Sequence, residues 1–132
     1  MTLYSYLKQF KFPIIEKETF FTEAYLYYQM ERPMLWTNKI IENGTYLSDG
    51  LTKNTIKLFV KAPSSWMLYN EIRMKSHKNF LKKIRYIIYF ISFCILSKKT
   101  YKMREHNLFI MALFYPVGLI GATYLKIRGG NI

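Results

Sequence analysis

The stretch that decides the predicted fold is Leu108-Phe-Ile-Met-Ala-Leu-Phe-Tyr-Pro-Val-Gly-Leu-Ile-Gly-Ala-Thr-Tyr-Leu125. It contains 18 residues without a charge, and the cations Lys126 and Arg128 follow it. An α-helix of this length is about 27 Å long, close to the roughly 30 Å of a bilayer hydrocarbon core. Tyr124 lies near one end, where membrane helices commonly carry interfacial aromatic side chains. We therefore expect a membrane-spanning helix over 108–125.

A second apolar run lies before this stretch. No residue interrupts a helical pattern from near Trp66 to Ser97, but the uncharged part, 86–97, is only 12 residues long. Counted from Asn79 the run has 19 residues, which form a helix about 28 Å long. Two interpretations remain open: residues 79–97 span a membrane, or they form a buried core helix.

Together the two runs predict the architecture of the region 66–132. Ten largely polar residues, 98–107, separate them, which is a suitable length for a connection between antiparallel helices. We expect a mainly α-helical protein in which a basic helix runs into a transmembrane hairpin of 79–97 and 108–125. The opposing interpretation is a soluble α-helical bundle with one very apolar helix, which would need no detergent in buffer.

The positive charge gathers in the same region. Of the net charge of +12, residues 1–72 contribute little, with eight cations and seven anions, whereas residues 73–132 hold twelve cations and only Glu105. These cations bracket the apolar runs, as is typical at the ends of membrane helices. All flanks are basic, so no membrane orientation follows. We expect an anionic lipid, such as cardiolipin, to contact Lys82, Lys83, Arg85, Lys98, Lys99, Lys126 and Arg128.

The N-terminal half, residues 1–65, has a different character. Its first thirteen residues lack the continuous apolar stretch of a cleaved secretory signal. Beyond Pro13, aromatic residues at three- and four-residue spacing predict a helix over 14–31. The dipeptides Asn43-Gly44 and Asp49-Gly50 indicate a turn-rich or short β segment over 37–61. We expect a small, partly helical, loop-rich soluble region. We expect four of its aromatic side chains to pack on a neighbouring subunit together with Trp66. They are Phe20, Phe21, Tyr25 and Tyr28.

Small residues in the apolar stretch predict close helix packing. Gly118 and Ala122 stand four residues apart with Gly121 beside them, a pattern that lets another helix approach closely. Pro116 would kink the helix one turn earlier and free a carbonyl that needs a neighbour. The partner helix is either 79–97 or a helix of a foreign subunit.

Several function classes are excluded by composition and spacing. The length suits a single domain, the 22 Tyr and Phe residues exclude a disordered chain, and a lone Cys94 excludes a disulfide scaffold. No acidic residue lies on an apolar stripe where burial would raise its pKa for acid–base catalysis. His77 and His106 flank opposite ends of 79–97, about 30 Å apart, which is too far for a shared haem. We expect no active site and no metal or cofactor beyond bound lipid.

One short segment resembles a known family. Trp66, Asn70-Glu71 and Arg73 precede the apolar run in an order similar to that in a short accessory subunit of the proton-pumping NADH dehydrogenase. The match covers about eight residues; one spacing is a residue longer, and a second Trp is missing. The overall profile also resembles small accessory subunits of mitochondrial respiratory complexes. The resemblance implies a non-catalytic structural or assembly subunit of a mitochondrial inner-membrane respiratory complex, in the electron transport chain or ATP synthase.

Two alternatives belong to other classes. Cations interleaved with aromatic residues over 73–85 are also typical of RNA binding, as in a mitochondrial ribosomal protein. A small membrane transport component is the second alternative, although neither apolar run carries an acidic residue for a substrate or proton. Release of the protein by high salt without detergent would favour RNA, and retention in carbonate-washed membranes would favour the membrane subunit.

Overall fold

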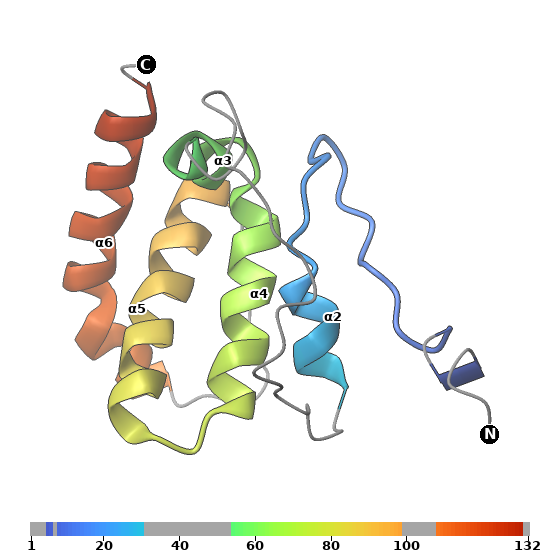
Figure 1. Cartoon of the computed structure of the whole chain (residues 1–132). Helices are drawn as coiled ribbons and strands as arrows, with labels where there is room; N and C mark the ends of the chain where they lie inside the picture. Colours follow the sequence, from blue (N-terminus) through green and yellow to red (C-terminus); the bar gives the residue numbers. More distant parts are fainter. Residues whose placement is uncertain (1–4, 7, 31–53, 99–107, 131–132) are drawn as a thin grey trace, which may run out of the picture.

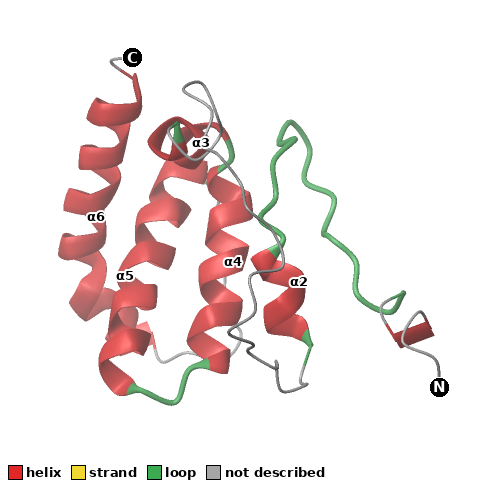
Figure 2. Cartoon of the chain, in the orientation of Figure 1, coloured by secondary structure: helices red, strands yellow, loops and turns green. Residues whose placement is uncertain are grey.

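The structure, a computed structural model, describes residues 5–6, 8–30, 54–98 and 108–130. Within these ranges the protein is mainly α-helical and contains no strand (Figure 2). The mainly α-helical class is therefore confirmed. The helices in chain order are α2 (Ala24–Gln29), α3 (Thr55–Lys61), α4 (Pro63–Ser76), α5 (Phe80–Ser97) and α6 (Leu108–Gly130) (Figure 1).

Helices α4 and α5 form an antiparallel pair joined by a short turn (Figure 1). The prediction of one unbroken helix from near Trp66 to Ser97 was wrong, because the backbone is extended at His77 and Asn79. The Asn79 side chain accepts a hydrogen bond from the Lys82 backbone N–H at 3.2 Å and so caps a new helix. The observed α5 nevertheless agrees closely with the predicted run 79–97.

The hydrophobic core lies mainly between α4 and α5. Its buried members are Met67 and Met74 of α4 with Tyr86, Phe90 and Phe93 of α5. Partly buried side chains of α3 and α6, among them Phe59, Met111 and Leu125, pack around this cluster. Phe90 is completely buried, so one side of the centre of α5 is covered by the protein itself.

Helices α5 and α6 run in the same direction, so the predicted antiparallel hairpin of 79–97 and 108–125 was wrong. Phe59 of α3 contacts Phe93 in the C-terminal part of α5, with 5.6 Å between ring centroids. Gly129, at the C-terminal end of α6, lies against Val60 of the same short helix. The C-terminal ends of both long helices therefore meet at α3, as Figure 1 also shows. The connection 99–107 lies outside the described residues.

The N-terminal region contains less helix than the sequence predicts. The predicted helix 14–31 is reduced to Ala24–Gln29, and the chain before it is irregular. Lys17 has a φ of 67°, in the left-handed region, which interrupts an α-helix.

Part of the predicted turn-rich or β segment is helical. Residues 55–61 form α3 rather than a strand, and 37–53 lie outside the described residues. Because this segment is helical, Phe59 packs against the core while the neighbouring Val60 lies beside α6. Tertiary packing thus overrides the local preference for an extended backbone.

Candidate membrane face and helix-lined groove

Helix α6 exposes an apolar surface over its whole length. Its mean hydropathy reaches 1.9 over an 18-residue window, of which only 11% is buried inside the protein. Among the described residues it is the one helix long and apolar enough to cross a membrane. The exposed large apolar side chains are Leu108, Phe109, Ile110, Leu113, Tyr115, Val117, Leu119, Ile120, Tyr124 and Ile127. We call this surface the α6 face.

The opposite side of α6 packs on α5 through the predicted small residues. Gly118 and Ala122 are buried, and Gly121 is half-buried. A Cβ atom added at Gly118 would lie only 2.8 Å from the Ile91 Cβ, and one at Gly121 would lie 2.6 Å from the Ser92 Oγ. Glycine is therefore required for this close approach of the two helices.

A buried hydroxyl strengthens the same contact. The Ser92 Oγ lies 2.9 Å from the Gly118 carbonyl oxygen and 2.9 Å from the Ile88 carbonyl oxygen, and it donates to them. Of the two open alternatives for the partner of the small residues, the helix at 79–97 occupies the position in this structure. Pro116 is exposed, and α6 continues through it.

The predicted lipid-contacting cations lie at both ends of the bundle. Lys82, Lys83 and Arg85 are near the N-terminal end of α5, and all except the half-buried Lys83 are exposed. Lys98 follows α5 and is exposed, as are Lys126 and Arg128 in the C-terminal part of α6. Lys99 lies outside the described residues. Because α5 and α6 are parallel, Lys98 shares its end of the bundle with Lys126 and Arg128 (Figure 1).

Within the chain, the aromatic side chains expected to meet a neighbouring subunit contact α4 and one another. Phe20 stacks on Trp66 with 5.9 Å between ring centroids, and Tyr28 meets Tyr69 at the same distance. Phe21 and Tyr25 contact each other at 4.7 Å. All of these residues are half-buried, so part of their surface is already used within the chain.

A carboxylate from the N-terminal segment caps α4. Glu18 accepts hydrogen bonds from the backbone N–H groups of Ser64 and Ser65, both at 2.8 Å, and from the Ser65 hydroxyl at 2.7 Å. Burial raises the pKa of Glu18, but these hydrogen bonds outweigh it and leave the pKa below its ordinary value of 4.5. Sequence reasoning missed this role, since a carboxylate 46 residues from the helix start leaves no local signal.

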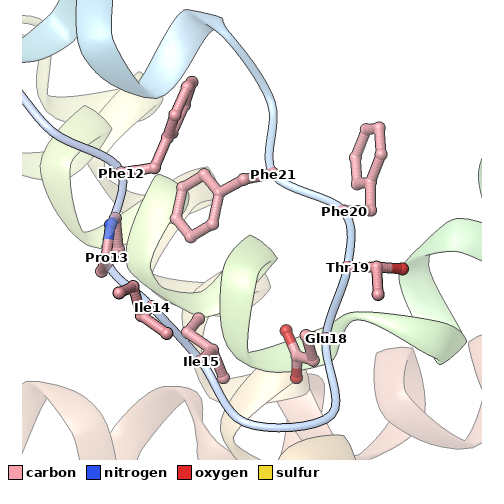
Figure 3. Close-up of a pocket in the computed structure, with 8 residues that line it drawn as sticks. All are labelled: Phe12, Pro13, Ile14, Ile15, Glu18, Thr19, Phe20 and Phe21. Atoms are coloured by element: carbon pink, nitrogen blue, oxygen red, sulfur yellow. The ribbon is translucent and has the colours of Figure 1, made fainter.

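The loop that carries Glu18 encloses a shallow hollow of about 420 Å³ (Figure 3). Figure 3 shows its eight lining residues, which all come from the single stretch 12–21. The carboxylate of Glu18 accepts three hydrogen bonds from α4, so it already has partners. This hollow is therefore a consequence of the cap rather than a candidate binding site.

A second cavity, of about 400 Å³, lies along α5 where α4 and α6 flank it. It is lined mostly by apolar and aromatic side chains, with two arginines, and we call it the α5 groove. Its lining residues are Phe59, Trp66, Tyr69, Asn70, Arg73, Arg85, Ile88, Tyr89, Ser92, Phe93, Gly121, Tyr124 and Leu125.

The Arg73 side chain is the most unusual member of this lining. Its guanidinium carbon lies 4.1, 5.1 and 5.8 Å from the ring centroids of Tyr86, Tyr69 and Tyr28, and its Nη2 donates to the Tyr86 hydroxyl at 2.6 Å. Burial raises the pKa of Tyr69, although the charge of Arg73 partly opposes this. The Nε atom of Arg73 and the Nε1 atom of Trp66 are buried, and neither has a hydrogen-bond partner among the described residues.

Neither metal-binding side chains nor known relatives indicate a function for the α5 groove or the α6 face. The part of the chain that the structure describes contains no group of His, Cys, Asp and Glu side chains suited to a metal ion. The Nδ1 atom of His77 lies 3.0 Å from the Arg73 carbonyl oxygen, and His106 is outside the described residues. No family model, no curated protein and no solved structure matches the chain.

Proposed function

We propose that this protein is a non-catalytic, membrane-anchored helical subunit of a larger complex. Helix α6 is the anchor, and its glycine-containing side attaches it to the bundle of α3, α4 and α5. The cations at both ends of the bundle contact anionic lipid headgroups, such as those of cardiolipin.

One observation carries the proposal: the α6 face is both strongly apolar and exposed. Soluble monomers rarely expose continuous apolar patches larger than a few hundred Å². The apolar core helix of a soluble bundle would be mostly buried. In α6, by contrast, only 11% of the apolar 18-residue window is buried inside the protein. A signal sequence would lie near the N-terminus, whereas α6 lies at residues 108–130. A bilayer or the apolar surface of another membrane subunit would cover this face.

The finer assignment is to a mitochondrial inner-membrane respiratory complex, with the NADH dehydrogenase complex as the first choice. It rests on the resemblance carried by Trp66, Asn70-Glu71 and Arg73, which lie together on α4. Of these, Asn70 is buried and donates to the Trp66 carbonyl oxygen at 2.8 Å, and Glu71 pairs with Lys75 at 3.4 Å. Their partners lie within the chain, as is expected of a structural role.

Paired lysine substitutions test the anchor. Leu113 and Ile120 are 62% and 70% exposed on α6, so Leu113→Lys with Ile120→Lys would leave the bundle folded but place two charges in the bilayer. We expect the variant to appear in the soluble fraction after a carbonate wash, while the wild type stays in the pellet. Phe80→Lys with Leu81→Lys is the matched control, because these side chains are equally exposed on α5. Equal retention of all three proteins would contradict the anchor.

Membership of the complex needs a separate experiment. After extraction with a mild detergent, the protein should migrate on a native gel together with respiratory-chain subunits, identified by mass spectrometry. Co-migration with ribosomal proteins, lost at high salt, would replace the proposal with the RNA-binding alternative.

A further inference from the structure

The α5 groove has the dimensions of a ligand site. Its volume of about 400 Å³ lies near the lower end of the roughly 300–1,000 Å³ range of small-molecule pockets. Three helices contribute to it, since Tyr69 comes from α4, Ile88 from α5 and Tyr124 from α6. The groove is thus formed by the packing of three helices and not within a single loop.

The groove carries positive charge without a matching carboxylate. Arg73 and Arg85 both line it, and none of the described acidic residues forms a salt bridge with either of them. The described ion pair on α4, Lys75 with Glu71, is made by other side chains. The described contacts of the Arg73 guanidinium are tyrosine side chains, which leave its charge without a neutralising anion.

Unused hydrogen-bond donors point to the same chemistry. Within the part of the chain that the structure describes, the buried Arg73 Nε and Trp66 Nε1 have no acceptor, although both side chains line the groove. Leaving a buried donor unpaired is costly, so such groups call for a ligand or water that accepts from them. A carboxylate at Arg73 offers an acceptor for a guanidinium N–H group.

The rest of the lining is suited to a hydrocarbon chain. Ile88, Phe93 and Leu125 present apolar surface, and Phe59 closes the lining at α3. From Arg85 to Phe93 the groove follows nine residues of α5, over which the helix rises by about 12 Å. The volume is at the small end of the ligand range, which favours one chain over the two or more chains of a phospholipid.

We propose that the α5 groove binds a long-chain fatty acid, with its carboxylate at Arg73, the first part of its chain along Ile88 and Phe93, and the rest of its chain extending beyond the groove. This goes beyond the anchoring role, because the groove lies between helices of the bundle, shares only Tyr124 with the α6 face and does not require α6 to span a membrane. It also differs from headgroup contacts at the helix ends, because the carboxylate is placed at Arg73, which is not one of those cations, although Arg85 belongs to both sets.

Trp66 makes the proposal measurable. In a Trp36→Phe background it is the remaining tryptophan of the two in the chain, and it lines the groove. The full-length protein in neutral detergent is titrated with brominated stearic acid, which quenches a nearby indole, and with its methyl ester, which has the same chain without the charge. We expect the acid to quench at about tenfold lower concentration than the ester, since a charged hydrogen bond contributes roughly 1.5–3 kcal/mol.

Variants separate the carboxylate from the chain. Arg73→Gln should abolish the difference between acid and ester, Arg73→Lys should keep part of it, and Lys75→Gln, on the same helix, should keep all of it. Ile88→Phe, which narrows the groove, should weaken quenching by both compounds. Circular dichroism and thermal unfolding of each variant show whether it is folded.

Four outcomes would overturn the proposal. One is equal quenching by acid and ester in the Trp36→Phe protein, and another is an unchanged preference in a folded Arg73→Gln protein. A third is displacement of the brominated acid by inorganic phosphate as readily as by stearate, which would show an anion site without a chain. Quenching by a brominated two-chain anionic phospholipid at lower concentration than by the acid would show that a membrane lipid is the ligand.

Discussion

At the scale of single residues, Glu18 connects two parts of the chain that are far apart in sequence. Its two carboxylate oxygens accept from the first free N–H groups of α4, which begins with Pro63 and has no side-chain cap of its own. The positive end of the helix dipole also favours a negative charge at this place. Ser64 and Ser65 both donate to Glu18.

Replacing Glu18 should therefore destabilise the protein. We expect Glu18→Gln to lower the free energy of unfolding at pH 7 by about 1 kcal/mol, the usual value of a helix cap. Denaturant unfolding in neutral detergent, followed by circular dichroism, measures the change. Glu16→Gln is the matched control, because Glu16 is exposed on the same loop. An equal effect of both substitutions would show that Glu18 acts only through the net charge.

The same carboxylate predicts a dependence on pH. Because the pKa of Glu18 is lower in the folded protein than its ordinary value of 4.5, its ionised form favours folding. This contribution is complete above the unfolded pKa and is lost as the pH falls through the lowered folded pKa. The stability difference between wild type and Glu18→Gln should therefore be constant near neutral pH and shrink below pH 4.5. A difference that grows on acidification would contradict this.

At the scale of elements, α6 has two unlike sides. The side with Gly118 and Ala122 is required for contact with α5, and the α6 face is largely exposed. Both properties follow from the sequence, because small residues at four-residue spacing and a long uncharged run are visible in it. Helix α5 differs, since its core residues Tyr86, Phe90 and Phe93 are covered by α4 and its neighbours.

A bulky side chain at the glycine contact should loosen the bundle. Gly118→Leu would drive its side chain into Ile91 and Ser92, and overpacking of this kind typically costs about 1–3 kcal/mol. We expect a lower thermal midpoint in detergent. Ala112→Leu is the control, because Ala112 is exposed on the same helix. If Gly118→Leu left the midpoint unchanged but released the protein from its complex, the small residues would be packing on a foreign helix instead.

At the scale of the whole molecule, the parallel arrangement of α5 and α6 is the main departure from expectation. It brings the C-terminal ends of both helices to α3, where Gly129 permits contact with Val60 and with the Ile56 carbonyl oxygen. It also creates the α5 groove, since Tyr124 and Leu125 reach the level of Phe59 only in this direction.

Engineered cysteines test this direction. A Cβ atom at Gly129 would lie 3.3 Å from the Val60 Cβ, close to the separation found in disulfides. In a Cys94→Ser background, Val60→Cys with Gly129→Cys should form a disulfide on mild oxidation, detected by a mobility shift on a non-reducing gel. Val60→Cys with Gly130→Cys is the control, because nothing lies within 4 Å of that neighbouring position. An antiparallel hairpin would leave both pairs reduced.

The sequence by itself determines the elements that depend on composition and spacing. The helical class, the extent of α5, the apolar stretch in α6 and the role of Gly118 and Ala122 in helix contact follow from runs of 18 or 19 residues and from spacing along one helix. Such signals are local, because hydrophobicity and side-chain size act on whatever surface lies next to them.

Only the tertiary structure decides what depends on partners distant in the sequence. The cap by Glu18 and the aromatic surroundings of Arg73 bring together residues from separate elements. The direction of α6 and the break at His77–Asn79 are settled between local conformations of similar energy. The glycine contact near the middle of α6 can be made in either direction, so it does not select one. The packing of Gly129 against α3 does, and with it the groove along α5 is formed.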